Sequence, residues 1–280
     1  MEFFKAQIYN NSIYRLIFRE GSIMTDKAYI NEVLDYIKTK WPLCVRTTEI
    51  DGDFHMALPY PYTVPCIRDT FNGFFYWDTY FTNLGLLRLG FTGLAKNNTD
   101  NLLYEMERYG YVPNANWRPL LNRSQPPYLY MMVRNIYDAI KDKEWLAVSF
   151  KTLKNEYSFW MEKRMTPTGL NRYYHNAAEE QLKEFYEEVN QRLNLNAQTE
   201  EEKVGYANHY LAEAESGWDF NPRFDGRCSD FLPVDLNSNL YAYEKTLGLF
   251  SEILGTGEKA QWEQRADNRQ KLMNKYLWNE

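Results

Sequence analysis

The sequence predicts an all-α protein, and three observations support that fold class. Apolar residues recur every three or four positions along most of the chain, which is the spacing of one helix face. No segment alternates apolar and polar residues convincingly enough to indicate a half-buried strand. Glycine or proline follows several of the helical stretches. Helices joined in this way are expected to pack as layered hairpins.

Roughly eight helices are expected from these patterns. In the first, Ile30, Val33, Leu34 and Ile37 share one face, and Pro42 stops the run. Proline is too frequent in the following segment for a helix, so we expect that segment to be extended or irregular. The expected helices span residues 28–41, 79–89, 100–109, a stretch opened by residue 124, 144–163, 179–192, 236–254 and 258–277.

The ends of these helices are predicted from residues that satisfy free backbone groups. Thr99 is expected to cap the third helix at its start, and Gly110 is expected to close it. Ser124 is expected to cap the fourth helix, with two prolines in the first turn, where a missing amide hydrogen costs least. Asp235 and Gly255 bracket the seventh helix.

Composition and charge exclude several classes of partner. The chain has 280 residues and a formal net charge of −6, without a basic stripe, so no nucleic acid partner is expected. No run approaches the roughly 18 apolar residues of a membrane span, so no membrane partner is expected. The first residues lack the pattern of a secretory signal, which makes a cytoplasmic location the default expectation. Nothing in the sequence indicates an oligomeric state.

Metal sites and cofactors are not expected either. The three cysteines and three histidines stand far apart, without the spacing of a metal site or a disulfide framework. Aromatic residues make up 17% of the chain. Most of them are expected to pack in the core, and a handful near the motifs described below could line a carbohydrate site.

The most informative segment is ESGWDF at residues 215–220. It places an acid beside a glycine and two aromatic rings. A carboxyl packed among aromatic faces is desolvated, which raises its pKa towards the range in which it can donate a proton. Asp219 is therefore a candidate general acid, and the alternative is that it is only a cap or turn residue.

Three further motifs precede this segment: YWDTY at 76–80, VPN at 112–114 and LNRSQPP at 121–127. Four such strings in this order resemble the trehalase family of glycoside hydrolases, over most of the chain from residue 59 onward. The resemblance implies an (α/α)6 toroid, a ring of twelve helices whose connecting loops form a sugar pocket. Because about eight helices are expected here, the ring is expected to be incomplete.

The resemblance makes Asp219 the catalytic acid and assigns sugar binding to the other motifs. Trp77 can pack its indole on a sugar ring while Asp78 accepts hydrogen bonds from hydroxyls, although Asp78 could also cap the next helix. Arg123 offers a planar set of donors, and Gln125 offers both a donor and an acceptor. The binding positions carried over by motif are Trp77, Asp78, Asn114, Arg123, Ser124, Gln125 and Gly217.

The chain also departs from the family pattern. Arg68 lies two residues farther from Trp77 than the family's arginine, so it either reaches the sugar through a longer loop or is a surface residue. The arginine and glutamate that the family keeps after its counterpart of residues 172–174 are not recognisable, which leaves a related glucoside open beside trehalose. The glutamate that serves as general base is not recognisable either, so this chain alone is expected to be an incomplete enzyme.

Two roles stay open from the residues alone. The charged segment 179–188 is most simply a solvated helix face, although one of its acids could face the substrate. Glu215 could bind sugar hydroxyls or only support the loop through hydrogen bonds.

The sequence therefore predicts a single glycoside hydrolase catalytic domain over residues 1–280. Residues 1–58 form a lead-in with the first helix, and residues 59–280 carry the motifs on a helical toroid. The resemblance implies that this toroid is truncated at its C-terminal end, so that the chain corresponds to the N-terminal part of the family's catalytic domain. We expect hydrolysis of the disaccharide α,α-trehalose, or of a closely related small α-glucoside, with inversion and release of glucose, and without a cofactor. The alternatives are a catalytically dead protein that binds carbohydrate or a partner, and another α-glycosidase on the same toroid.

Overall fold

The computed structural model describes residues 27–68 and 71–279. The chain divides between Val45 and Arg46 into two compact units, which are described separately. In the first unit, α2 (Lys27–Lys40) is followed by a 3-10 turn at Trp41–Cys44. Pro42 lies in that turn, so the helix ends beside the proline as the sequence predicts.

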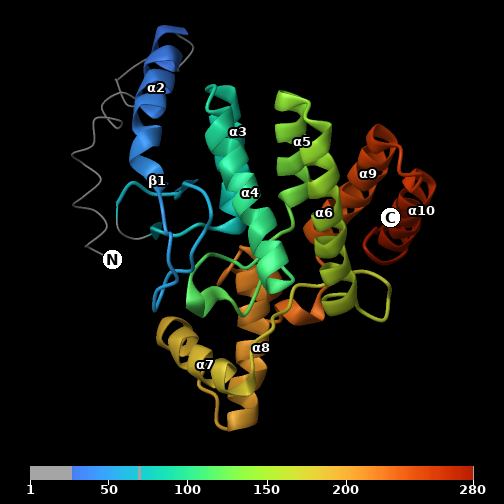
Figure 1. Cartoon of the computed structure of the whole chain (residues 1–280). Helices are drawn as coiled ribbons and strands as arrows, with labels where there is room; N and C mark the ends of the chain where they lie inside the picture. Colours follow the sequence, from blue (N-terminus) through green and yellow to red (C-terminus); the bar gives the residue numbers. More distant parts are fainter. Residues whose placement is uncertain (1–26, 69–70, 280) are drawn as a thin grey trace. The chain divides into compact units, whose positions relative to one another are not determined.

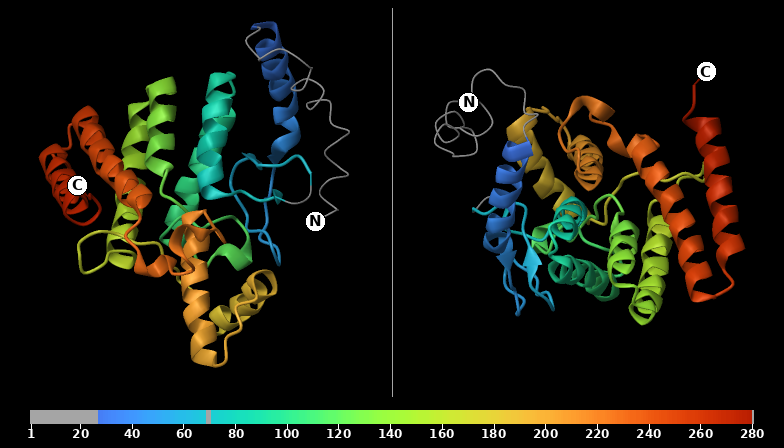
Figure 2. Two further views of the ribbon diagram at one scale, coloured as in Figure 1. Left: turned by 180° about the vertical axis from the view of Figure 1, so that it is seen from behind. Right: turned by 90° about the horizontal axis from the view of Figure 1, so that it is seen from above.

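The second unit is built from helices that pair in chain order (Figure 1). α3 packs on α4, α5 on α6, α7 on α8 and α9 on α10. Seen from above, the α3–α4, α5–α6 and α9–α10 hairpins follow one another across the unit (Figure 2). The helices are α3 (Tyr76–Arg88), α4 (Thr92–Tyr109), α5 (Leu129–Ile140), α6 (Lys143–Lys163), α7 (Glu179–Leu193), α8 (Glu200–Ser216), α9 (Val234–Leu254) and α10 (Lys259–Tyr276).

The all-α prediction is confirmed. With α2, the described part of the chain contains nine α-helices, against the twelve of a closed (α/α)6 toroid. Two-residue strands, β1 (Val45–Arg46) and β2 (Tyr62–Thr63), are the only strands among residues 27–68 and 71–279. Layered helical hairpins are therefore the architecture, as the sequence patterns indicate.

Two expected N-caps are wrong. α4 begins at Thr92, so Thr99 lies inside the helix, where its hydroxyl donates to the Ala95 carbonyl at 2.9 Å. Ser124 opens no helix, because α5 begins only at Leu129. Both hydroxyls are buried and donate to backbone carbonyls, so tertiary and helical contacts replace the capping role that local sequence suggests.

Other helix ends are partly as expected. α3 and α9 begin after Phe75 and Pro233, so Asp78 and Asp235 lie in the first turn, where a negative charge favours the helix dipole, rather than at the N-cap. Gly255 closes α9 in the left-handed conformation, with φ of 68°, as expected. Gly110 closes α4 in the same way.

A hydrophobic core cluster packs against the C-terminal half of α8. The cluster comprises Phe159, Trp160, Tyr173, Ala212, Phe224, Cys228, Leu236 and Leu240, and so joins α6, α8 and α9. Protein cores are close-packed and yield little to local strain. The last turn of α8, which follows Ala212, is therefore expected to be held rigidly by this packing.

A buried carboxyl ties together the starts of α3 and α5. The Tyr76 hydroxyl donates to Glu156 of α6 at 2.5 Å and accepts from the Leu129 amide at 2.9 Å. Tyr243 of α9 donates to the other Glu156 oxygen at 2.8 Å. Burial raises the pKa of Glu156 to about 7, although the bonds from Tyr76 and Tyr243 oppose that rise. The network fixes the first turns of two helices that follow motif-bearing segments.

Candidate active site

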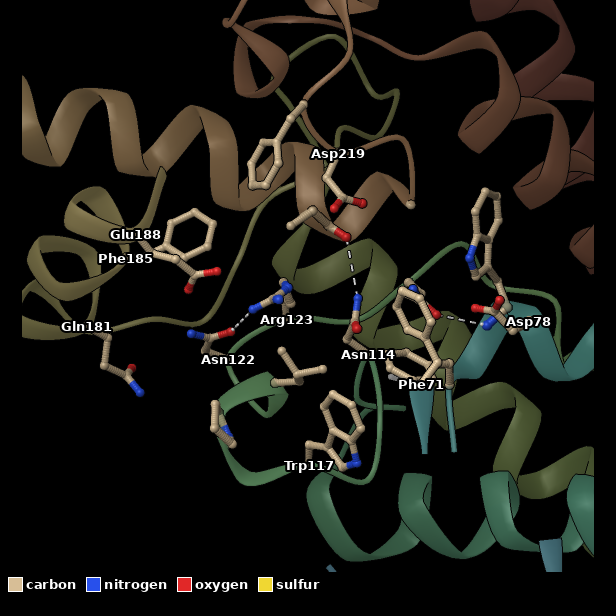
Figure 3. A pocket seen from close by; sticks show the side chains of 18 of the residues that line it. Phe71, Asp78, Asn114, Trp117, Asn122, Arg123, Gln181, Phe185, Glu188 and Asp219 are labelled. Atoms are coloured by element: carbon tan, nitrogen blue, oxygen red, sulfur yellow. Dashed lines mark hydrogen bonds between the residues drawn. The ribbon is translucent and has the colours of Figure 1, made fainter. Parts of the chain in front are cut away.

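The motif-bearing segments of the second unit meet around a pocket of about 620 Å³ (Figure 3). One wall comes from the segment that leads into α3, and a second comes from the loop between α4 and α5. α7 and the end of α8 complete the lining. The pocket thus gathers residues that lie far apart in the sequence.

Asp219 lies in a tight turn that directly follows α8 and faces the pocket (Figure 3). Gly217 ends α8 in the left-handed conformation, with φ of 74°. The Trp77 indole packs over Gly217 so closely that a Cβ at Gly217 would lie 2.5 Å from the ring. Glycine is thus required twice at this position, by its backbone angle and by the ring above it. Phe220 also has a positive φ, of 59°, which is a strained conformation for a bulky residue.

Glu215, wholly buried at the end of α8, accepts four hydrogen bonds. Arg164 donates to both carboxylate oxygens, each time at 2.8 Å. The backbone amides of Ser124, at 2.9 Å, and Tyr174, at 2.8 Å, complete the set. Of the two roles that the sequence left open, this geometry fits support of the loop, because both oxygens are occupied and shielded from the pocket.

The start of α3 presents Trp77 and Asp78 to the pocket. The Trp77 backbone amide donates to Gln125 Oε1 at 3.0 Å, which leaves the Gln125 amide nitrogen as the donor of that side chain. Burial raises the pKa of Asp78, and the charge of Asp219 adds to the rise. A carboxyl with a raised pKa that lines a pocket is typical of sites that handle protons. Asp219 itself is exposed, so the desolvated carboxyl that the sequence predicts at this position is not found in the structure.

Asn114 links two walls of the pocket. Its backbone carbonyl accepts from the Tyr76 amide at 3.0 Å, and its backbone amide donates to the Arg123 carbonyl at 2.9 Å. Its side-chain amide donates to the Ala214 carbonyl at 3.4 Å, near the end of α8 (Figure 3). The loop that carries the VPN motif is thereby held against both the start of α3 and the end of α8.

Arg123 brings a desolvated positive charge to the pocket. The residue is only 9% exposed, and burial lowers the pKa of its guanidinium to about 10, although the charges of Asp219 and Glu188 oppose that shift. Its Nη1 donates to Asn122 Oδ1 at 2.8 Å, whereas its buried Nε has no hydrogen-bond partner among the described residues. Buried polar groups are normally paired, so this donor is suited to an oxygen-rich ligand.

α7 contributes a wall that the sequence only hinted at. The guanidinium carbon of Arg123 lies 5.9 Å from the centre of the Phe185 ring, and Figure 3 shows Phe185 and Glu188 of α7 on the same side of Arg123. Two acids of the charged segment, Glu184 and Glu188, line the pocket rather than one. The spacing of the lining residues in the sequence could have indicated this wall, because residues three or four positions apart share one helix face. The α7 residues that line the pocket are Gln181, Glu184, Phe185, Glu188 and Arg192.

Three aromatic residues of the lining were not predicted at all. Phe71, Phe75 and Trp117 come from irregular segments, where no periodic pattern points to a common face. Trp117 packs on Gly73 so tightly that a Cβ there would lie 2.4 Å from the indole. Such a contact between distant residues has no signal in a single sequence.

Seven of the nine predicted site residues line the pocket: Trp77, Asp78, Asn114, Arg123, Gln125, Gly217 and Asp219. Ser124 lies behind the wall, 1% exposed, with its hydroxyl donating to the Val112 carbonyl at 2.6 Å. Arg68 is exposed and is not among the lining residues. The geometry therefore brings the acid and six of the binding positions together, and their roles stay predictions.

Within residues 27–68 and 71–279, no group of three His, Cys, Asp or Glu side chains is placed to hold a metal ion. His175 bonds to Asn208 at 2.7 Å behind the site, and no histidine of the described chain lines the pocket. None of the described helices combines the length and apolarity needed to cross a bilayer.

Comparisons with known proteins agree on one family. The sequence profile of the family described as Trehalase matches residues 18–280. The periplasmic trehalase of Escherichia coli O1:K1 / APEC is 33% identical over 273 residues, and the periplasmic trehalase of Shigella dysenteriae serotype 1 is equally similar. Each match covers 88% of this chain and 47% of the relative. The structure of the neutral trehalase from Saccharomyces cerevisiae matches with a TM-score of 0.66 and 25% identity, over 88% of this chain and 52% of that one.

Two facts follow from these matches. The chain spans about half the length of the curated relatives that it matches. The cytoplasmic location expected from the sequence is wrong, because these relatives are named as periplasmic proteins. That expectation rested on the lack of a recognisable signal in the first residues, which lie outside the described part of the structure.

Proposed function

The chain belongs to the trehalase family of glycoside hydrolases, and from that premise we propose that its pocket hydrolyses α,α-trehalose with inversion, releasing glucose. One observation carries the proposal beyond family membership. The turn with Asp219 and six of the predicted sugar-binding positions converge on the same pocket of about 620 Å³. That volume lies within the usual range for small-molecule sites.

In this proposal Asp219 donates a proton to the glycosidic oxygen of the leaving sugar. Trp77 packs on a sugar ring, while the polar side chains of Asn114, Arg123 and Gln125 bind hydroxyl groups. The unpartnered Nε of Arg123 supports this assignment, because a sugar oxygen would satisfy it.

Inversion also requires a carboxylate that activates water on the far side of the bond. Asp78, Glu184 and Glu188 are the further carboxyl side chains that line the described pocket. Arg192 donates to Glu188 at 2.8 Å, so the charge of Glu188 is partly compensated. The family's arginine and glutamate are not recognisable after residues 172–174. In this proposal, a sugar bound beside α7 contacts Glu184 and Glu188 in their place.

Trehalose binding and glucose release together test the proposal. Calorimetry with trehalose should give saturable binding that weakens about tenfold in Gln125→Ala, because Gln125 would lose its hydrogen bonds to the sugar. Gln264→Ala is the matched control, since Gln264 is an exposed residue of α10 that donates to Asn268 and should not affect binding.

The outcomes separate the alternatives. Binding with hydrolysis of trehalose by the full-length protein supports the proposal. Binding without hydrolysis favours a carbohydrate-binding protein, and cleavage of another α-glucoside with trehalose left intact favours a different glycosidase on the same fold. A protein that binds no trehalose at all contradicts the proposal.

We also infer a periplasmic location from the printed names of the matched relatives. Fractionation of cells that express the full-length protein checks it, with release in the periplasmic fraction as the expected result. We further propose that residues 1–280 belong to a single catalytic domain, with 1–58 as its lead-in. Limited proteolysis tests this, and a fragment that stays folded on its own would contradict it.

A further inference from the structure

Glu213 is a buried acid that the proposed mechanism does not use. It lies on α8, two residues before Glu215, and is wholly buried. The two glutamates differ sharply in their partners. Glu215 is held by Arg164 and two backbone amides, whereas among the described residues no lysine or arginine forms an ion pair with Glu213, and its Oε2 has no hydrogen-bond partner.

Among the described residues, one hydrogen bond reaches the carboxyl group of Glu213, and it spans the turn that carries Asp219. Glu213 Oε1 accepts from the Asn221 backbone amide at 3.0 Å. The backbone carbonyl of Glu213 accepts from the Ser216 hydroxyl at 2.6 Å, and that hydroxyl in turn accepts from the Trp218 amide at 3.1 Å. Glu213 therefore contacts the turn at both ends, through its backbone at the start and its side chain at the finish.

The turn needs such an anchor. Gly217 and Phe220, on either side of Asp219, both have positive φ angles, and Phe220 is not a residue that adopts this conformation readily. A strained backbone persists only where surrounding contacts hold it. The Asn221 side chain adds a bond from its amide to the Trp218 carbonyl, and its Oδ1 accepts from the Arg223 amide at 2.7 Å.

The protonation of Glu213 is consistent with a buried anchor. Burial raises the pKa of this carboxyl to about 7, and the charge of Asp219 adds to the rise, while the bond from Asn221 opposes it. The carboxyl is thus neutral in mildly acidic conditions, where it accepts the Asn221 bond without burying a charge. An apolar side chain would fill the same space at lower cost but could not accept that bond.

We propose that Glu213 is a positioning residue, which fixes the conformation of the 217–221 turn and thereby places the Asp219 carboxyl in the pocket. This inference rests on the proposed role of Asp219 as general acid. Glu213 is not among the residues that line the pocket, so it acts through the turn and not on the sugar. Small displacements of a catalytic group reduce turnover strongly, because reaction requires a narrow range of geometries.

Three variants test the proposal. Glu213→Leu keeps the approximate volume and removes the acceptor, whereas Glu213→Gln keeps an acceptor for the Asn221 amide. Glu105→Leu is the matched control, since Glu105 of α4 is also buried, has a raised pKa and does not line the pocket, and one of its oxygens has no hydrogen-bond partner in the described part of the chain. All three are compared with the unchanged full-length protein.

We expect Glu213→Leu to lower kcat for trehalose by on the order of 10- to 100-fold with KM within about twofold. Glu213→Gln should retain most of the activity, and Glu105→Leu should keep kcat even if it unfolds more readily. Hydrogen exchange of the Asn221 amide should accelerate in Glu213→Leu alone.

Unchanged exchange at Asn221 in Glu213→Leu, or equal losses of kcat in Glu213→Leu and Glu105→Leu, would overturn the proposal. Faster exchange with unchanged kcat would also overturn it, because the turn would then not position the acid. If the unchanged protein hydrolyses no trehalose, the proposed function fails, and the exchange rates alone decide whether Glu213 holds the turn.

Discussion

Gly217 is the residue on which two parts of the pocket depend at once. Its left-handed backbone ends α8 and starts the Asp219 turn, and its missing side chain makes room for the Trp77 indole. The turn that carries the proposed acid and the indole of the proposed sugar platform thus meet at one glycine. The motif was recognisable in the sequence, but the reason for the glycine was not, because Trp77 lies 140 positions away.

Gly217→Ala should weaken trehalose binding and destabilise the protein. Alanine in this conformation costs about 1 kcal/mol, and its Cβ would displace the Trp77 ring, which adds to that cost. Calorimetry measures the affinity and urea denaturation measures the free energy of unfolding. Gly205→Ala is the control. That glycine lies inside α8 without a positive φ or any atom within 4 Å of a Cβ, so alanine there should stabilise by up to about 1 kcal/mol. Equal effects of the two substitutions would contradict this account of Gly217.

At the scale of elements, the ion pair between Arg164 and Glu215 joins the end of α6 to the end of α8. Both side chains are almost fully buried, and Glu215 also accepts from two loop amides. Replacing one member of such a pair leaves the other charge buried and unpaired. The pocket walls should therefore depend on this pair for their mutual placement.

Glu215→Gln should lower the free energy of unfolding by about 3–5 kcal/mol, because Arg164 would keep a buried charge without its carboxylate. Combining it with Arg164→Met should recover part of that loss. Urea denaturation measures both effects. The exposed pair of Lys183 and Glu179 provides the comparison, and Glu179→Gln should change stability very little, because solvent screens that pair. A loss of that small size in Glu215→Gln would show that the buried pair does not hold the elements together.

The sequence predicted most helices of the fold but not α8. Its buried face consists largely of alanine and glutamate, among them Glu213 and Glu215, so it lacks the apolar stripe by which helices are recognised. The N-caps predicted at Thr99 and Ser124 were wrong, because each hydroxyl donates to a backbone carbonyl and does not cap a helix. The motif residues of the site were found because they are consecutive, whereas the α7 wall depends on tertiary packing.

At the scale of the whole molecule, the second unit buries several carboxyls with raised pKa values. Burial raises the pKa of Glu156 to about 7, and it raises those of Glu105 and Glu244. Between their ordinary value of 4.5 and their raised values, these groups bind more protons in the folded chain than in the unfolded chain. Their stabilising effect is fully present below about pH 4.5 and is lost as the pH rises through the folded pKa.

The free energy of unfolding should therefore fall between about pH 5 and pH 8. Glu156 alone accounts for up to about 3 kcal/mol of that fall, from the difference between 4.5 and about 7. Glu156→Gln, which keeps one acceptor oxygen for the two tyrosine hydroxyls and cannot ionise, should flatten the profile. Urea denaturation across this pH range measures it, and the exposed Glu180→Gln should leave the profile unchanged. An unchanged slope in Glu156→Gln would show that this carboxyl ionises equally in both states.

We propose that Asp219, held in the pocket by its turn, is the acid that cleaves the glycosidic bond of trehalose. Proton NMR of trehalose hydrolysis tests it most directly, because it follows the rate and the anomers of the released glucose in one experiment. The full-length protein should release α- and β-glucose in equal initial amounts, as inversion requires. Asp219→Asn should lower kcat by about 10²- to 10⁴-fold with little change in trehalose affinity. Near-normal turnover in Asp219→Asn would contradict this role of Asp219. Initial release of α-glucose alone by the unchanged protein would contradict inversion.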